Sequence, residues 1–479
     1  MCLLRIGKTP FLLNAIILSS GTIIAIVLFS LFFYPSTNPV LALFSSFRVQ
    51  ISEGFSTANN QGLQLPKIYD INLKADIVFG GLNFPSSMAF LGSNDLLVLE
   101  KNKGTVQRII NGEMVPKPLL NVSVSNQSER GMLGIGVYKN ESKAGRVNIF
   151  LYFTQSIAED NETLSNSLYK YELVENKLVN PKKLLDLPSS PGPAHNGGRI
   201  TIGPDNNVYF TVGNLNAIER ERYLTRAENV EKGRDPDGRA GILRVTQDGQ
   251  PLPNGSLIGD KYPLVLYYAY GIRNSFGMDF DPLTGKLWDT ENGPNFGDEI
   301  NLVDPGFNSG WNKVQGIWEE DNGRAGPIIN KKQERERLVD FNGQGKYSNP
   351  EFIWASSVGP TALTFLDSEI YGKEYENDLF VGDFHNGNIY HFDLTENRTA
   401  LELDGFLEDK IADSRDELKN NLFGQGFGGI TDIGVGPDGY LYILSIYQSG
   451  NDCIANELGE LPCISYSSPL QGTIFRVVP

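Results

Sequence analysis

Short runs of alternating apolar and polar residues recur along most of the chain. Residues 208–212 (VYFTV) and 440–444 (YLYIL) alternate with a period of two, which is typical of strands that bury one face. Turn sequences such as GPDN (203–206) and GPDG (436–439) connect these runs, because proline presets φ and aspartate or glycine accepts a tight turn. Beyond residue 34 no apolar period of 3.6 residues is sustained. The pattern therefore predicts an all-β protein.

Six units repeat the order strand, turn, strand. They begin at Ser86, Gly131, Gly197, Ser275, Thr361 and Ile430. Regular hairpin units in a chain with 51 glycines indicate radial repetition, so we expect a six-bladed β-propeller over residues 76–479. The last apolar run, residues 473–478, is expected to complete a blade, because an unpaired strand edge invites aggregation. A β-sandwich is the second choice, and six similar units fit it poorly.

The N-terminal segment has a different character. Residues 11–34 contain no charge, and Arg5 and Lys8 precede them. As a helix this run would be roughly 36 Å long, enough to cross a hydrocarbon core of about 30 Å. The positive-inside rule then predicts a single-pass membrane protein with residues 1–34 as cytoplasmic start and transmembrane helix, 35–75 as a stalk, and the propeller on the extracytoplasmic side. A cleaved signal peptide is the alternative.

Charge and cysteine content narrow the possible partners and compartment. The net charge of -16 argues against nucleic-acid binding, which needs a basic surface. Cys453 and Cys463 lie ten residues apart near the C-terminus, and in an oxidising compartment they could form a disulfide. Two free thiols are the alternative.

Two segments carry candidate chemistry. His195 stands before a strand and beside Gly197 and Gly198, which would let a ligand approach the backbone; such a histidine is either a base or a structural loop residue. Further along, residues 291–294 (ENGP) are followed by Asp298 and Glu299. Glycine and proline carbonyls together with carboxylates are the hard oxygen ligands that Ca²⁺ takes. A turn flanked by solvated acids is the simpler reading of the same residues.

Eight motifs occur in one order along the chain. They are residues 131–134 (GMLG), 195–200 (HNGGRI), 241–245 (GILRV), 271–274 (GIRN), 291–294 (ENGP), 298–301 (DEIN), 308–311 (NSGW) and 432–441 (DIGVGPDGYL). Through these motifs the chain resembles the glucose/sorbosone dehydrogenase family, the soluble PQQ-dependent aldose sugar dehydrogenases. The resemblance spans nearly the whole extracytoplasmic part, and the fold it implies is a six-bladed propeller.

The resemblance also implies roles for individual residues. A neutral His195 would take the proton of the sugar's anomeric hydroxyl while hydride passes to the quinone, giving a lactone. Arg273 would stabilise negative charge on the quinone oxygen, and Asn274 would orient it. The carbonyls of Gly293 and Pro294 would hold a Ca²⁺ that polarises the cofactor. The expected partners are an aldose sugar or related polyol and an external electron acceptor.

The sequence departs from the family pattern where PQQ is bound. Glu129 replaces a glutamine that contacts cofactor and sugar, His385 stands where a basic residue is expected, and residues 429–432 (GITD), with Thr431, replace an Arg-x-Arg-Asp pattern. Each missing charge-assisted hydrogen bond would cost about 1.5–3 kcal/mol. The candidates for compensating charges are Arg130, Lys313 and Arg324.

Two functions of different kinds follow. The first is a membrane-anchored quinoprotein sugar dehydrogenase, favoured by the joint presence of His195, Arg273 and Asn274. The second is a non-catalytic, Ca²⁺-stabilised propeller that binds a glycan or a protein, favoured by Glu129 and the missing arginines. A lactonase-type hydrolase ranks third, because no suitable cluster of carboxylates stands out for its metal.

Overall fold

The computed structural model describes most of the chain beyond residue 64. The described residues are 65–139, 146–156, 164–216, 223–253, 255–317, 337–446 and 472–479. The expected transmembrane helix, the first part of the stalk, Arg324 and the Cys453–Cys463 pair lie outside them. Within the described ranges no helix is long and apolar enough to cross a bilayer.

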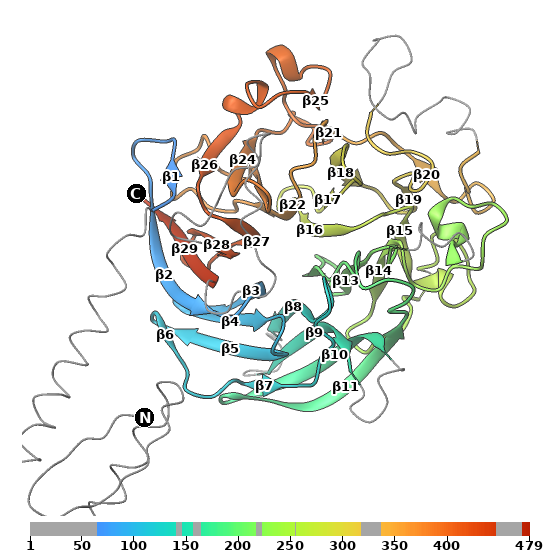
Figure 1. Ribbon diagram of the computed structural model, residues 1–479, viewed down its shortest axis with the longest axis horizontal. Helices are drawn as coiled ribbons and strands as arrows, with labels where there is room; N and C mark the ends of the chain where they lie inside the picture. Colours follow the sequence, from blue (N-terminus) through green and yellow to red (C-terminus); the bar gives the residue numbers. More distant parts are fainter. Residues whose placement is uncertain are drawn as a thin grey trace, which may run out of the picture. The chain divides into compact units, whose positions relative to one another are not determined.

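The described strands form six sheets, which follow one another around a common axis (Figure 1). The first contains β3 (Pro85–Gly92), β4 (Asp95–Glu100), β5 (Thr105–Ile110), β6 (Glu113–Met114) and β7 (Leu120–Asn121). The second contains β8 (Met132–Lys139), β9 (Val147–Gln155), β10 (Ser165–Val174) and β11 (Lys177–Leu187). The third contains β12 (Ile200–Ile202), β13 (Val208–Val212), β14 (Gly241–Val245), β15 (Tyr267–Tyr270), β19 (Phe307–Asn308) and β20 (Lys346–Tyr347).

The other three sheets complete the ring. The fourth contains β16 (Ser275–Phe280), β17 (Leu287–Glu291), β18 (Asp298–Val303), β21 (Phe352–Trp354) and β25 (Ile411–Ala412). The fifth contains β22 (Pro360–Phe365), β23 (Leu379–Asp383), β24 (Asn388–Phe392), β26 (Leu422–Gln425) and β1 (Lys67–Ile68). The sixth contains β27 (Gly429–Val435), β28 (Leu441–Ile446), β29 (Gly472–Val478) and β2 (Lys74–Leu82). Short 3₁₀ turns lie between strands at η3 (Arg226–Glu228), η4 (Leu264–Leu266), η5 (Gly405–Leu407) and η6 (Glu417–Lys419).

The innermost strand of each sheet defines the ring. These strands are β3, β8, β12, β16, β22 and β27, and each starts within three residues of a repeat unit counted in the sequence. Each contacts the innermost strand of the next sheet, and β27 contacts β3, so the ring is closed. The prediction of an all-β propeller is confirmed, and the number of sheets equals the number of repeat units.

The two ends of the propeller meet in the sixth sheet. Strand β2 pairs antiparallel with β29, with Lys74 opposite Val478 and Leu82 opposite Gly472. The last apolar run therefore completes a blade, as predicted. Residues 65–75, which the sequence analysis assigns to the stalk, belong to the compact unit Gln64–Pro479, because β1 pairs with β26 and β2 begins at Lys74.

The apolar core lies between neighbouring sheets. Tyr152 of β9 and Phe210 of β13 belong to one buried cluster, with their ring centroids 5.9 Å apart. Phe90 of β3 packs against Tyr442 of β28 across the junction of the first and sixth sheets, at 5.1 Å. Because both faces of each sheet are covered in this way, the inner strands are rigid supports for the loops at their ends.

Candidate functional site

A cavity of about 280 Å³ lies at the centre of the ring, lined by residues that lie in the strands of the six sheets or in the loops directly beside them. Eight of the ten cofactor, catalytic and metal residues predicted from the sequence line it, although they are spread from position 129 to position 431. They are Glu129, His195, Arg273, Asn274, Gly293, Pro294, His385 and Thr431. Asp298 and Glu299 do not line it. One site therefore brings together segments that are far apart in the sequence.

His195 is positioned by its own strained backbone and by Asn214. Its φ of 59° is in the left-handed region, and its side chain is 8% exposed. The Nδ1 atom lies 2.7 Å from Oδ1 of Asn214, which also accepts the backbone N–H of Asn216 at 3.1 Å. The Asn214 oxygen is thus an acceptor, so Nδ1 of His195 carries the proton and Nε2 keeps its lone pair. Burial and the nearby charge of Arg273 lower the pKa of His195 to about 4.

Glu129 joins the histidine to Asn274. Its Oε2 atom accepts the backbone N–H of His195 at 2.7 Å and the side-chain amide of Asn274 at 3.2 Å. The Asn274 Oδ1 atom accepts the backbone N–H of Gly197 at 3.1 Å. Burial raises the pKa of Glu129, and these hydrogen bonds partly offset that effect. Glu129 therefore fixes the position of both His195 and Asn274.

Arg273 is held on three sides. Its Nη1 atom donates to the carbonyl of Asn292 at 2.7 Å, and its backbone N–H donates to Oε1 of Glu291 at 2.6 Å. The guanidinium carbon lies 5.4 Å from the ring centroid of Trp311, within cation–π distance. The cation is thus preorganised in the cavity wall, as a group that stabilises developing negative charge must be.

The 293–294 turn enters the cavity, and Asp298 holds it from behind. One oxygen of Asp298 accepts the N–H of Gly293 at 2.8 Å; the other accepts the N–H groups of Val358 and Gly359 at 2.7 and 2.8 Å. Ser357 Oγ donates to the second oxygen at 2.9 Å. With four donors already bound, this carboxylate connects β18 to the 357–359 loop and does not line the cavity; a role as metal ligand stays a prediction from the sequence.

Glu299 is also removed from the cavity. Its Oε1 atom accepts the N–H of Gly316 at 2.6 Å and the amide of Gln315 at 2.9 Å. Its Oε2 atom lies 3.3 Å from Ser309 Oγ, and the same hydroxyl lies 2.6 Å from Glu291 Oε2. Burial raises the pKa of Glu299 to about 8. Glu299 thus lies in a buried acid cluster behind Arg273. It does not line the cavity, where the other predicted calcium ligands, Gly293 and Pro294, lie.

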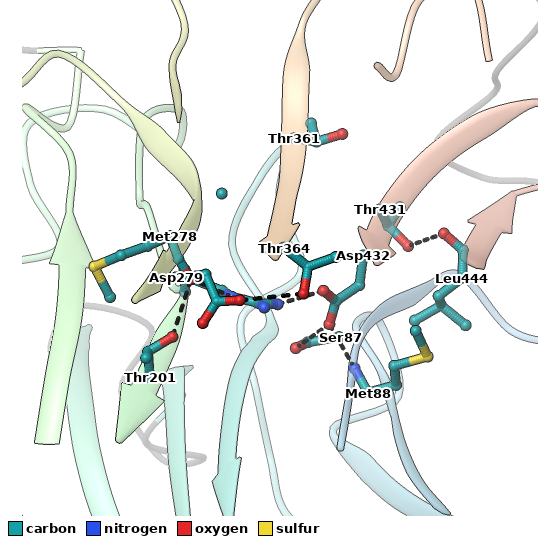
Figure 2. A network of polar contacts seen from close by, with 12 residues as sticks. Ser87, Met88, Thr201, Met278, Asp279, Thr361, Thr364, Thr431, Asp432 and Leu444 are labelled. Carbon is teal, nitrogen blue, oxygen red and sulfur yellow. Dashed lines mark hydrogen bonds and ion pairs between the residues drawn. The ribbon is translucent and has the colours of Figure 1, made fainter. Parts of the chain in front are cut away.

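Sequence reasoning missed two cations of the cavity wall. Arg199 was part of the 195–200 motif, yet no role was given to it; its Nη1 atom forms an ion pair with Oδ1 of Asp432. Figure 2 shows the network around this pair: Ser87 Oγ and the N–H of Met88 donate to the other oxygen of Asp432 at 2.9 and 2.8 Å. Asp432 therefore offsets much of the charge of Arg199.

Lys101 is the second unpredicted cation, and in the part of the chain that the structure describes it forms no ion pair with a carboxylate. Its Nζ atom donates to the carbonyls of Ser128 and Arg130 at 2.8 and 2.9 Å, on either side of Glu129. Burial lowers the pKa of Lys101 to about 8, and the charge of Glu129 acts against this shift. No local pattern could have found Lys101, because only the fold brings β4 beside the 128–130 loop.

The remaining predicted residues have weaker positions. His385 is exposed, with Nδ1 3.4 Å from the carbonyl of Ser357. Thr431 donates to the carbonyl of Leu444 at 3.3 Å (Figure 2). Of the suggested compensating cations, Arg130 donates to the carbonyls of Ser189 and Gly192 and does not line the cavity; neither does Lys313.

The cavity therefore combines flat apolar walls with positive charge. Phe84, Phe276 and Phe384 line it together with Lys101, Arg199 and Arg273. A planar ring system can pack against phenyl rings, and a carboxylate among these cations can be neutralised. The arrangement fits a planar, anionic ligand placed beside a neutral histidine whose Nε2 atom can accept a proton.

Comparison with known proteins agrees with this site. A family model for glucose/sorbosone dehydrogenase matches residues 82–454. Quinoprotein glucose dehydrogenase B of Acinetobacter calcoaceticus is 28% identical over 60% of this chain and 62% of its own length. Aldose sugar dehydrogenase YliI of Escherichia coli strain K12 is 24% identical over 79% of this chain and 91% of its own length. The PQQ-bound aldose sugar dehydrogenase of Streptomyces coelicolor has the same fold, with a TM-score of 0.55, 23% identity, and coverage of 86% of this chain and 99% of that one.

Proposed function

Because this chain belongs to the glucose/sorbosone dehydrogenase family, we propose that it is a PQQ-dependent dehydrogenase that oxidises aldose sugars at the anomeric carbon to lactones, or related polyols to the corresponding carbonyl compounds. The observation that carries the proposal is the convergence of His195, Arg273, Asn274 and Glu129 on one cavity with flat walls and three cations. The related glucose and aldose sugar dehydrogenases support the same substrate class.

The donor set of the cavity fits PQQ, which is planar and carries three carboxylates. Lys101 and Arg273 are the cations whose charge is least offset by a direct carboxylate contact, and Arg199 adds a third that is paired with Asp432. These residues, with Asn274 and Thr431, would hold the cofactor. They take the place of the arginines missing from residues 429–432.

The carbonyls of Gly293 and Pro294 would hold the proposed Ca²⁺ at the cavity wall. Position 293 requires glycine, because a Cβ atom there would lie 2.1 Å from the carbonyl oxygen of Phe296. Since Asp298 binds the N–H of Gly293, it would fix the turn without touching the ion.

The residues of the chain supply the proton transfer and the placement of the sugar. When bound, PQQ supplies the acceptor for the two electrons and the hydrogen that leave the sugar as hydride. The neutral His195 would take the proton of the anomeric hydroxyl at Nε2, so that the carbon–oxygen double bond of the lactone can form. Asn214 keeps the tautomer, and Arg273 stabilises the negative charge that develops beside it.

The proposal includes a compartment and an external acceptor. The uncharged residues 11–34 after Arg5 and Lys8 support a membrane anchor with the propeller on the extracytoplasmic side. A disulfide between Cys453 and Cys463, which needs an oxidising compartment, stays a prediction.

Reconstitution tests the function. The purified chain is mixed with PQQ and Ca²⁺, cofactor binding is titrated, and dye-linked oxidation of a panel of aldoses is measured. We expect saturable PQQ binding and oxidation of at least one aldose. Absence of PQQ binding at tens of micromolar would overturn the dehydrogenase proposal. Binding of PQQ without oxidation of any sugar or polyol would instead favour the non-catalytic glycan- or protein-binding propeller.

A further inference from the structure

A cluster of metal-ligating side chains lies outside the cavity, on the fifth sheet. Asp378 directly precedes β23, His391 lies in β24, and Asp393 directly follows β24. In the register of this antiparallel pair, Phe380 is opposite His391 and Leu379 is opposite Phe392. The next pair in the same register is Asp378 with Asp393. Because side chains alternate along a strand, Asp378, His391 and Asp393 share one face.

The distances within this cluster suit a common ligand. The Nε2 atom of His391 lies 2.9 Å from Oδ2 of Asp378. One ligand atom from each of the three side chains lies within 4.8 Å of the other two. Around a tetrahedral ion with bonds of about 2.0 Å, ligand atoms stand about 3.3 Å apart. Asp393 is exposed, so its side chain has room to turn toward the other two ligand atoms.

The histidine is fixed in place before any ion binds. Its ring packs against Tyr375 at 5.1 Å and Phe380 at 5.0 Å between centroids. Its backbone N–H donates to the carbonyl of Asn421 at 2.7 Å, and the Asn421 amide donates back to the His391 carbonyl at 3.1 Å. A preorganised ligand loses little conformational entropy when it binds a metal.

The charges of the cluster are unbalanced. Two carboxylates directly opposite each other destabilise a strand pair. Among the described residues, Asp378 forms an ion pair with His391 alone, and no ion pair joins Asp393 to a lysine or arginine. Glu402 adds a third carboxylate near Asp393, and its backbone N–H donates to the Asp393 carbonyl at 2.9 Å. A divalent cation would remove this repulsion.

We propose that Asp378, His391 and Asp393 bind one Zn²⁺ ion, each carboxylate through one oxygen and the imidazole through one nitrogen, with water as the fourth ligand. Imidazole and carboxylate together are a usual ligand set for zinc, whereas Ca²⁺ and Mg²⁺ take oxygen ligands. The ion joins the ends of β23 and β24 across the strand pair. It stabilises the fifth sheet.

This site is independent of the proposed dehydrogenase chemistry. Strand β23 runs from Leu379 to Asp383, and the cavity residues Phe384 and His385 follow its other end. At about 3.3 Å per residue, the five residues of the strand separate the zinc site from the cavity by roughly 17 Å.

Competition with a chromophoric chelator measures Zn²⁺ affinity on the purified full-length chain, with excess Ca²⁺ present throughout. We expect one equivalent of Zn²⁺ at micromolar affinity or better, and a rise in Tm on adding Zn²⁺. His391→Gln and Asp393→Asn should each weaken the affinity at least tenfold and abolish the rise in Tm. His385→Gln removes the one histidine that is neither the proposed base nor a proposed zinc ligand, and it should leave zinc binding unchanged.

The two cluster variants keep the test decisive. If His391→Gln does not fold, the exposed Asp393→Asn still reports on the site. Three results would overturn the proposal: no zinc binding by the wild-type chain, wild-type zinc affinity in both His391→Gln and Asp393→Asn, or loss of zinc binding in His385→Gln. Failure of PQQ binding in the same preparation would leave the zinc result unaffected.

Discussion

The side-chain oxygen of Asn214 lies 2.7 Å from Nδ1 of His195, so Nε2 is the nitrogen of this cavity-lining imidazole that can accept a proton. The Asn214 amide fixes this tautomer of His195 without adding a charge beside it. A carboxylate at the same position would hold the same tautomer but would also favour the imidazolium form.

Substitution of Asn214 separates these two effects. Asn214→Ala should lower kcat/KM about tenfold to a hundredfold, because the histidine loses its orientation. Asn214→Asp should keep most of the rate but raise the pKa of His195, so the acidic limb of the kcat/KM profile should move to higher pH. The pH profiles of the reconstituted variants check this. An unchanged profile in Asn214→Asp would show that the contact does not tune the base.

The pKa of His195 predicts a broad pH range for the wild-type chain. With a pKa of about 4, His195 is neutral throughout pH 5–8, so protonation of this group should not lower kcat/KM in that range. His195→Gln should lower kcat by about 10²–10⁴-fold, because the general base is lost. PQQ affinity, measured by titration, should stay within about threefold. Full activity in His195→Gln would show that another group takes the proton.

Lys101 should contribute to cofactor affinity in a pH-dependent way. With a pKa of about 8, its charge is present below pH 8 and is lost as the pH rises through 8, so PQQ binding should weaken between pH 7 and 9. Lys101→Met should weaken PQQ binding about 10- to 100-fold and remove this pH dependence. Calorimetric titration at several pH values checks both effects. Because Lys101 also braces the 128–130 loop, a melting curve of the variant is the control for folding.

The acid cluster behind Arg273 should make folding stability depend on pH. The Ser309 hydroxyl has one proton but contacts carboxylates of both Glu291 and Glu299, so one of these acids must carry a proton for both contacts to be hydrogen bonds. The pKa of Glu299 in the folded chain, about 8, is above the unfolded value of about 4.3. The stabilising contribution is therefore complete below about pH 4 and is lost as the pH rises through 8.

Urea denaturation at pH 5, 6, 7 and 8 measures this dependence. The free energy of unfolding should fall with rising pH, by up to about 1.4 kcal/mol per pH unit for one proton. Glu299→Gln should flatten the slope, because an amide cannot ionise. The exposed Glu113, changed to Gln, is the matched control and should leave the slope unchanged. A parallel slope in Glu299→Gln would contradict a shared proton in this cluster.

The fold was largely predictable, because hairpins are local. The period of two and the GPDN and GPDG turns specify each strand pair from neighbouring residues, and the innermost strands begin close to where the repeat units begin. The residue at which the propeller unit begins was not predictable. Strand β1 is only two residues long, and it pairs with β26, more than 350 positions further along.

The site was predictable where a residue type alone carries the chemistry. His195, Arg273 and Asn274 stand in motifs and all line the cavity. Asp298 and Glu299 stand in an equally clear motif, but the motif does not reveal that Val358 and Gly359, in the loop before β22, donate hydrogen bonds to the Asp298 carboxylate. The direction in which an acid points is decided by partners distant in sequence.

The pairing of β2 with β29 joins residues roughly 400 positions apart, so the ring can close only after β29 has been synthesised. Closing a loop of that length costs about 5 kcal/mol of chain entropy. Strand β29 is translated after all the other described strands, so a nascent chain exposes an unpaired edge of β2 and of β28 until β29 emerges from the ribosome. Loss of β29 (Gly472–Val478) would leave β2 and β28 without their common partner, so the ring could not close.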